Sequence, residues 1–195
     1  MPVVTGLRAA GRGRVRVELD GDAWRVLPLE PVVQAGLAEG VELDRPRLRT
    51  LARELRRARA LSVAGRALAR RDLSERRLRE RLSRAGVAPA GTDEAVGTLL
   101  RAGLVDDERF ASARALALAE RGLGDAAIRF DLDQQGVAEA TAETALAGLE
   151  PERDRAQRIV SMRGGGVATA RYLARRGFGE DAVEAAAGVP IAPEG

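Results

Sequence analysis

Three short stretches that end alike decide the fold of this chain: Arg84–Val87 (RAGV), Gln134–Val137 (QQGV) and Arg175–Phe178 (RRGF). Each places a glycine and then an apolar residue after a segment with helical periodicity, and a leucine stands four residues before each glycine. A glycine in the left-handed conformation ends a helix well, and the next apolar residue then folds back onto that helix. Three such ends in matched context indicate an internal repeat.

Each repeat is predicted to hold a long helix, a central helix that ends at the glycine, and a short third helix. We predict repeats at residues 58–103, 104–149 and 150–189, preceded by a connecting helix over 46–57. The last residues, 190–195, are predicted to be a disordered tail.

The first 45 residues follow a different pattern. Apolar and polar residues alternate from residue 15 to residue 19, and Asp20-Gly21 supplies a turn, which predicts a β-hairpin over 14–27. A short helix should follow, with Pro31 in its first turn and Gly40 just past its end. The predicted fold class is therefore mainly α: three tandem three-helix repeats after a small N-terminal α+β extension.

The composition excludes most kinds of catalysis. The 195 residues include no Cys, no His and no Lys, so all 32 positive charges are arginines. These absences exclude disulfides, Cys/His zinc sites, His-based triads, the Walker A motif and Schiff-base chemistry. We expect no catalytic residues, no metal and no cofactor. One alternative remains open: a metal-dependent hydrolase that uses carboxylates of residues 106–154, of which at least three would have to converge.

Neither a signal peptide nor a membrane span is expected. Met1–Ala10 lacks a charged start followed by a long apolar run, and no stretch approaches the roughly 20 apolar residues that cross a bilayer. These patterns predict a cytoplasmic protein without membrane contact.

Charge is strongly segregated along the chain. Residues 53–86 hold 12 arginines and four acidic residues, whereas residues 91–154 hold 14 acidic residues and six arginines. One interpretation is that helix surfaces in contact with solvent must be charged, and that the sign of this charge varies along the chain without a functional reason. The interpretation we favour is a bipolar molecule whose basic half contacts nucleic acid or an acidic protein surface.

Two further stretches resemble the RecX family. Gly103–Ala111 (GLVDDERFA) is similar to the family's hallmark between its first two repeats, and Leu73–Leu82 (LSERRLRERL) resembles its first central helix. The resemblance covers about residues 58–188, and it is weakest in the third repeat, where Thr169 stands at the position of Leu78 and Ile128. The hallmark residues that we expect to be structural, as helix caps and core, are Gly103, Leu104, Asp106, Asp107, Phe110 and Ala111.

The resemblance implies a regulator of the RecA recombinase. Proteins of this family are implicated in docking within the groove of the RecA–DNA filament, where they block strand exchange and damp its ATPase and co-protease activities. It implies a role in DNA repair and the SOS response, and we expect a monomer whose own DNA binding is weak and independent of sequence.

Arginines on the central helices are the predicted contacts with that partner. Arg77, Arg81 and Arg84 form a stripe roughly 100° around the helix from the apolar face. For any single arginine a solvated helix face is the competing interpretation. The predicted partner-binding residues are Arg70, Arg71, Arg76, Arg77, Arg81, Arg84, Arg171, Arg175 and Arg176.

Two other groups could touch phosphate, although a plainer interpretation is favoured for each. The arginines before the hairpin (Arg8, Arg12, Arg14) are predicted to lie in a solvated terminal arm. The glycine-rich stretch Arg163–Gly166 is predicted to be an interhelical turn, because it follows no strand and contains no Lys. Two other functions remain alternatives: a DNA-binding module that acts without RecA, and a helical scaffold for a different acidic partner.

Overall fold

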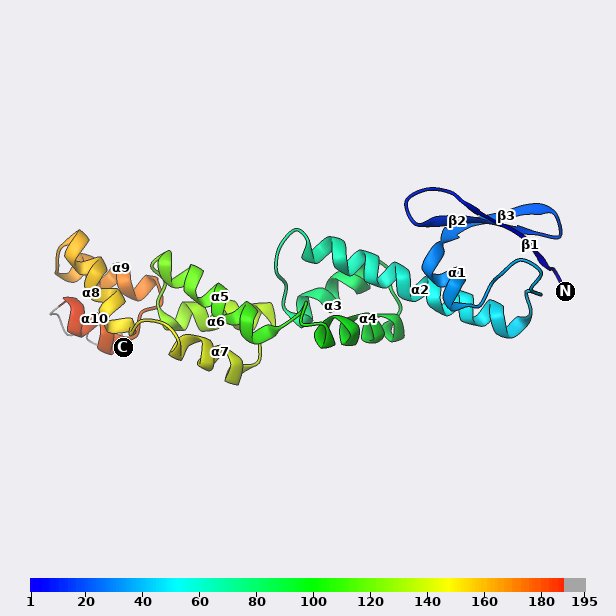
Figure 1. Ribbon diagram of the computed structural model, residues 1–195. Coiled ribbons are helices and arrows are strands. Elements are labelled where there is room, and N and C mark those ends of the chain that lie inside the picture. Colours follow the sequence, from blue (N-terminus) through cyan, green and yellow to red (C-terminus); the bar gives the residue numbers. More distant parts are fainter. Residues whose placement is uncertain (188–195) are drawn as a thin grey trace. The chain divides into compact units, whose positions relative to one another are not determined.

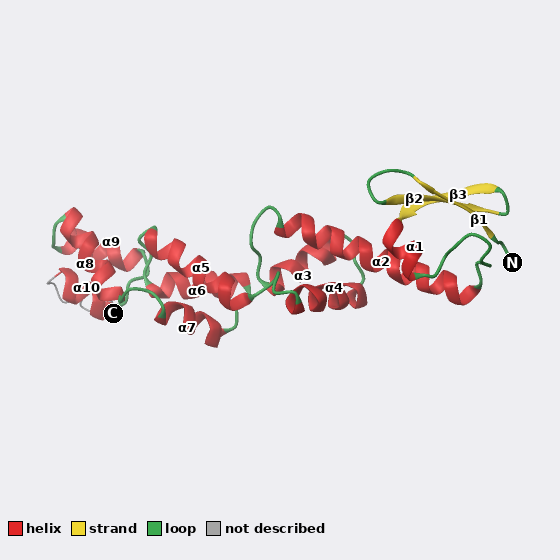
Figure 2. Cartoon of the chain, in the orientation of Figure 1, coloured by secondary structure: helices red, strands yellow, loops and turns green. Residues whose placement is uncertain are grey.

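Figure 1 shows the computed structural model of the protein, which describes residues 1–187. Within these residues the chain forms a three-stranded sheet followed by helices alone (Figure 2). The strands are β1 (Val4–Ala9), β2 (Arg14–Leu19) and β3 (Asp22–Pro28). The helices are α1 (Leu29–Gln34), α2 (Arg45–Leu68), α3 (Glu75–Arg84), α4 (Pro89–Arg101), α5 (Asp107–Glu120), α6 (Asp125–Gln135), α7 (Glu139–Ala147), α8 (Glu152–Arg163), α9 (Val167–Arg175) and α10 (Glu180–Ala187).

The chain divides into two compact units. The first comprises residues 1–70 and 81–98, and the second comprises residues 71–80 and 99–195. The division passes through α3, whose first six residues belong to the second unit and whose last four belong to the first. The predicted mainly α fold class is confirmed.

The N-terminal sheet is antiparallel, with strand order β1-β2-β3. The predicted hairpin is confirmed, since β2 pairs with β3 through a turn in which Asp20 and Gly21 both have positive φ (53° and 92°). The predicted terminal arm is wrong, because Arg8 lies in a third strand, β1, that pairs with β2. One face of the sheet and helices α1 and α2 enclose a core that includes Val4, Val17 and Leu51.

Helix α1 ends earlier than we predicted. It begins at Leu29 with Pro31 in its first turn, as expected, but it ends at Gln34. Gly36 rather than Gly40 ends it: Gly36 has a φ of +64°, and the N–H of Leu37 reaches back to the carbonyl of Val32 (3.1 Å). The first glycine that could take the left-handed conformation therefore ended the helix.

One continuous helix, α2, runs through the predicted connecting segment and into the first predicted repeat. Asp44 caps it, because the Asp44 side chain accepts a hydrogen bond from the N–H of Arg47 (2.8 Å). The repeat boundaries predicted from sequence stay a proposal, and the predicted tail lies outside the described residues.

The three repeat ends are confirmed. Gly86, Gly136 and Gly177 have φ values of +72°, +78° and +81°. The residue after each glycine donates its N–H to the carbonyl of the leucine four residues before that glycine, at 3.1, 3.1 and 3.2 Å. These leucines (Leu82, Leu132, Leu173) are fully buried. Each central helix thus ends in a hydrogen bond typical of a Schellman motif, and a core leucine accepts it.

Separate cores stabilise the second and third repeats. Helices α5, α6 and α7 surround a cluster built on Phe110, Ile128 and Leu132, and α8, α9 and α10 surround one built on Leu173, Phe178 and Val183 (Figure 1). The alanines at the helix contacts let the backbones approach closely, which suits the low aromatic content of the chain (3%). The packing is therefore local to each repeat, as in other repeat proteins.

Candidate partner-binding site

Four arginines converge on one pocket in the first unit. The last turn of α2 supplies Arg66, the second residue after its end is Arg70, and α3 supplies Arg81 and Arg84. The pocket has a volume of about 350 Å³, and its apolar floor is formed by Val63, Ala67 and Ala85.

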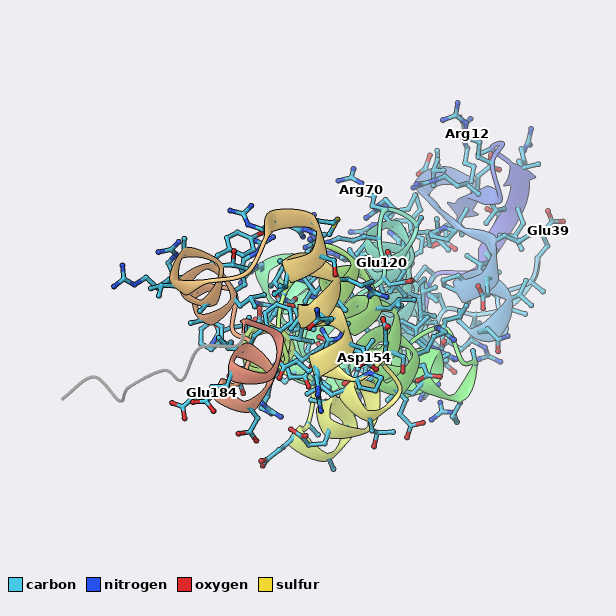
Figure 3. All side chains as sticks on the ribbon, turned by 90° about the vertical axis from the view of Figure 1, so that its left-hand side faces the viewer. Arg12, Glu39, Arg70, Glu120, Asp154 and Glu184 are labelled. Atoms are coloured by element: carbon cyan, nitrogen blue, oxygen red, sulfur yellow. The ribbon has the colours of Figure 1, made fainter. Side chains whose placement is uncertain are left out.

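The electrostatics of this pocket favour an anion. No acidic residue lines it, and all four arginines are exposed. Figure 3 shows the Arg70 side chain extending away from the ribbon. Arg66 is oriented by its own helix, since its Nη1 donates to the Ser62 hydroxyl (2.9 Å). Guanidinium groups bind carboxylates and phosphates through paired donors and stay charged at any physiological pH, so the pocket suits such groups.

Arg66 was missing from the predicted set. It stands four residues before Arg70, and residues with this spacing lie on one face when the segment is helical. The i,i+4 spacing was therefore the sequence signal that could have found it.

Arg76 and Arg77 have a different place: they contact the end of α6 inside the second unit. Arg77 Nη2 donates to the Gln134 carbonyl (2.6 Å), and Arg77 Nε donates to the Gln135 side-chain oxygen (3.2 Å). Arg76 Nη2 also donates to the Gln134 carbonyl (3.3 Å). Two cations thus neutralise carbonyls at a helix C-terminus, where the helix dipole favours positive charge.

The first residues of α3 complete this junction between repeats. The Ser74 hydroxyl donates to the Gln135 carbonyl (2.5 Å), and it also accepts the N–H of Arg77 (3.2 Å), so Ser74 caps α3. Ser74 is fully buried. Arg76 lies so close to Gly136 that a Cβ atom there would be 2.3 Å from Arg76 Cδ.

The same kind of junction recurs between the second and third repeats, made here mainly by backbone atoms. The N–H of Gly124 donates to the Arg176 carbonyl (2.9 Å), and the N–H of Ala126 donates to the Gly177 carbonyl (3.1 Å). A Cβ atom on Gly124 would lie 2.3 Å from the Gly177 backbone. The start of one central helix therefore contacts the end of the next one in both places.

A carboxylate from the following repeat caps each junction. Asp107 Oδ1 accepts the N–H of Glu75 at the start of α3 (2.8 Å), and Glu152 Oε1 accepts the N–H of Asp125 at the start of α6 (2.6 Å). Desolvation of the half-buried Asp107 carboxyl raises its pKa despite the hydrogen bond from Glu75.

The remaining predicted arginines lie elsewhere in the second unit. Arg71 lines a second pocket, of about 280 Å³, together with Phe110 and Arg121. Arg171 and Arg175 are exposed on α9. Arg176 is half-buried, and its Nη2 donates to the Arg121 carbonyl (2.6 Å). Partner binding by any of these residues stays a prediction.

The comparisons with known proteins bear on the fold first. The crystal structure of a regulatory protein RecX superposes with a TM-score of 0.81 and 20% sequence identity, over 95% of this chain and 98% of that one. RecX from Lactobacillus salivarius superposes with a TM-score of 0.59 and 15% identity, over 66% of this chain and 92% of that one. Among curated proteins, no sequence matches significantly.

A family model for the second three-helix domain of RecX matches residues 106–146. Together with the two superpositions, this match shows that the chain has the fold of the RecX proteins. The matched residues span α5, α6 and almost all of α7, so the second repeat carries the clearest RecX sequence signal.

Residues 103–111, the stretch that resembles the RecX hallmark, supply helix caps and core residues, although Leu104, which we also expected to be structural, is 59% exposed. Asp106 caps α5 by accepting the N–H of Arg109 (2.9 Å), while the neighbouring Asp107 caps α3. Phe110 and Ala111 are buried in the core of the second repeat. Two adjacent carboxylates thus cap two different helices, which explains why the RecX hallmark contains both.

One equivalent position on the three central helices shows how the repeats differ in chemistry. Where the first repeat has Arg81, the second has Asp131, whose carboxylate binds the Arg114 guanidinium through both oxygens. The third repeat has Tyr172 there, with the guanidinium groups of Arg163 and Arg176 at 4.1 and 5.6 Å from its ring centre. The basic pocket is therefore a property of the first repeat.

Thr169 explains the weak point of the RecX resemblance in the third repeat. It is buried at a position that Leu78 and Ile128 fill in the other repeats, and its hydroxyl donates to the Gly164 carbonyl (2.8 Å). The glycine-rich stretch forms the turn between α8 and α9, as predicted.

Two other findings concern sites and membranes. Among the described residues, no group of three or more acidic side chains is placed to hold a metal ion. None of the described helices is both long enough and apolar enough to cross a membrane.

Proposed function

We propose that this protein is a non-enzymatic cytoplasmic regulator that binds the RecA–DNA filament and inhibits its ATPase, strand-exchange and co-protease activities. One observation carries the proposal: a chain with the RecX fold presents a pocket lined by four arginines and by no acidic residue. A RecA filament offers two kinds of anion to such a pocket, the carboxylates of its protomers and the phosphates of its DNA.

Arg70, Arg81 and Arg84 from the predicted set, together with Arg66, are the proposed contacts. They come from two helix ends that pack together, so their backbone positions are fixed while the long side chains adapt. An anion in the pocket would be bound by several guanidinium groups at once, over an apolar floor that lowers the local dielectric and strengthens each contact.

The repeat architecture supports the same function in a second way. The second and third repeats each have their own core, and successive central helices meet end to end at junctions of the same kind. A chain built this way can follow a groove, because each repeat mainly contacts its neighbours.

The test is the single-stranded-DNA-dependent ATPase rate of RecA as this protein is titrated in. The informative variant is Arg70→Gln with Arg81→Gln, which removes two pocket charges. We expect the wild type to suppress the rate and the double variant to need about tenfold more protein for the same suppression, which corresponds to about 1.4 kcal/mol. Arg76 and Arg77 are left unchanged because they hold the end of α6.

The matched control is Arg45→Gln with Arg49→Gln, which removes two exposed arginines of α2 that do not line the pocket. If the control loses inhibition as much as the pocket variant, net charge rather than the pocket is responsible. If the wild type leaves the ATPase rate unchanged at every ratio and binds DNA equally well without RecA, the protein is a sequence-independent DNA-binding module instead.

A further inference from the structure

The outer face of the N-terminal sheet carries a row of arginines. In the strand register Arg8 of β1 lies opposite Arg16 of β2, which lies opposite Val26 of β3. Val15 and Val17 are buried in the core, so the residues that alternate with them, including Arg14 and Arg16, point to the other face. Arg8, Arg14 and Arg16 are all exposed.

The turn between β1 and β2 adds a fourth arginine in an unusual conformation. Gly11, Arg12 and Gly13 have φ values of +74°, +50° and +69°. A left-handed conformation is unfavourable for a residue with a side chain, and Arg12 is one of two such non-glycine residues among those described. Backbone hydrogen bonds fix this turn, since Ala10 donates to the Arg14 carbonyl (2.9 Å). The Arg12 side chain extends away from the ribbon (Figure 3).

These positive charges are only partly compensated. Glu18 is the acidic residue on this face, and Arg8 Nε lies 3.3 Å from its Oε1. Arg14 Nη2 donates to the Val26 carbonyl (2.9 Å). Within the part of the chain that the structure describes, Arg12 and Arg16 have neither an ion pair nor a side-chain hydrogen bond. Like charges opposite each other on neighbouring strands destabilise a sheet, so the row of arginines is not explained by folding.

The chemistry of this face separates two kinds of partner. Interfaces between proteins are depleted of charge at their centres and rich in aromatic residues, whereas nucleic-acid interfaces are polar and strongly positive. The outer face has four arginines, one glutamate and a single large apolar side chain, Val26, which is 39% exposed. Aromatic side chains that could stack on bases are missing from its register positions.

We propose that the outer face of the β1–β2–β3 sheet binds the phosphate backbone of nucleic acid, through Arg8, Arg12, Arg14 and Arg16. This surface goes beyond the proposed function, because it needs neither RecA nor the arginine pocket. Binding by phosphate contacts alone is independent of base sequence and weakens steeply with salt.

The test uses the full-length protein and a fluorescein-labelled single-stranded oligonucleotide of mixed sequence. Fluorescence anisotropy gives the dissociation constant at several salt concentrations. The variant is Arg8→Gln, Arg12→Gln and Arg16→Gln together, and Arg14 is kept because it bonds to β3. The control, Arg45→Gln, Arg49→Gln and Arg56→Gln together, removes the same charge from exposed residues of α2.

We expect the sheet variant to bind at least tenfold more weakly at low salt, while the control stays within about twofold of the wild type. Each phosphate contact on a single strand contributes about 0.7 to the slope of log K against log salt, so three lost contacts should reduce the slope by about 2. Circular dichroism and thermal melting establish that both variants fold.

Two results would overturn the proposal. One is equal loss of binding in the sheet variant and the control, which would make the effect one of net charge. The other is unchanged DNA binding in the sheet variant together with loss of binding to labelled poly-glutamate, which would identify the face as a site for acidic protein. Neither result bears on inhibition of the RecA ATPase, so the two proposals fail separately.

Discussion

The close approach of Gly124 to Gly177 gives a sharp test of the junction between the second and third repeats. In Gly124→Ala the new Cβ would lie 2.3 Å from the carbonyl carbon and oxygen of Gly177 and from the nitrogen of Phe178. Gly124 has a φ of −83°, so alanine fits its backbone conformation and the whole effect comes from the contact. All three opposing atoms are backbone, so the junction must open by about 1 Å to reach an ordinary van der Waals distance.

The expected cost follows from what that opening breaks. It strains two hydrogen bonds, from Gly124 N–H to the Arg176 carbonyl (2.9 Å) and from Ala126 N–H to the Gly177 carbonyl (3.1 Å). Each contributes about 1 kcal/mol, and overpacking adds about 1–3 kcal/mol. We therefore expect a loss of about 3–5 kcal/mol, which lowers the Tm of a chain of this size by about 10 °C.

Gly103→Ala in the same unit is the matched control. Gly103 has a φ of +65° and nothing within 4 Å of an added Cβ. The substitution therefore costs only what a left-handed conformation costs alanine, which is about 1 kcal/mol of stability, or about 3 °C in Tm. Calorimetry gives the melting temperatures, and hydrogen exchange should show faster exchange at Gly124 and Ala126 only in Gly124→Ala. Equal melting temperatures for the two variants would refute the reasoning.

Three further changes test other contacts. Because burial raises the pKa of Asp107, its contribution to stability is complete below the ordinary value of 3.8 and is lost as pH rises through the higher folded value. Asp107→Asn, which keeps an acceptor for the Glu75 N–H, should therefore flatten the stability measured by urea unfolding across that pH window. Arg155→Met removes a buried guanidinium that binds the Asp125 carboxylate, and it should cost about 3–5 kcal/mol in the same assay. Arg12→Gly removes the strain of a left-handed residue with a side chain, which stabilises the folded protein. It also gives the unfolded chain more conformational freedom, which destabilises the folded protein by a similar amount. The Tm of this variant should therefore stay within about 2 °C of the wild type.

The sequence predicted those parts of the fold whose signal is local. The ends at Gly86, Gly136 and Gly177 depend on a glycine and on a leucine four residues earlier, and both are visible in the chain. The hairpin depends on strict alternation and on Asp20-Gly21. Such features need no knowledge of distant residues, and for this reason they could be predicted.

Strand β1 could not be predicted because its register is irregular. The pairing with β2 shifts between Val4 and Gly6, so the alternation of apolar and polar residues is interrupted. Gly6 also lies close to a distant residue, since an added Cβ would be 2.5 Å from Glu18 Oε2, at the end of that flexible side chain. Locally this segment resembles a loose arm, and only its pairing with β2 shows that it is a strand.

The candidate site was predicted in part for a related reason. An arginine stripe on a helix shows which side chains share a face, but it does not show what that face meets. Arg81 and Arg84 line a pocket, whereas Arg77, on the same stripe, reaches the Gln134 carbonyl 57 positions along the chain. The helical pattern is the same for all three, so only the tertiary contact separates a partner-binding role from a structural one.

Helix α2 contacts the end of α3 by the same chemistry that joins α3 to the end of α6. At the first junction an arginine donates to the last carbonyls of a central helix, as Arg77 does to Gln134 at the end of α6. At the end of α3 the same role belongs to Arg59 of α2, whose Nη2 donates to the Ala85 carbonyl (3.1 Å). Ala60 and Ala64 of α2 are fully buried. Arg59 stands within the first predicted repeat, so this contact joins two helices of one repeat, whereas the contact of Arg77 joins two successive repeats.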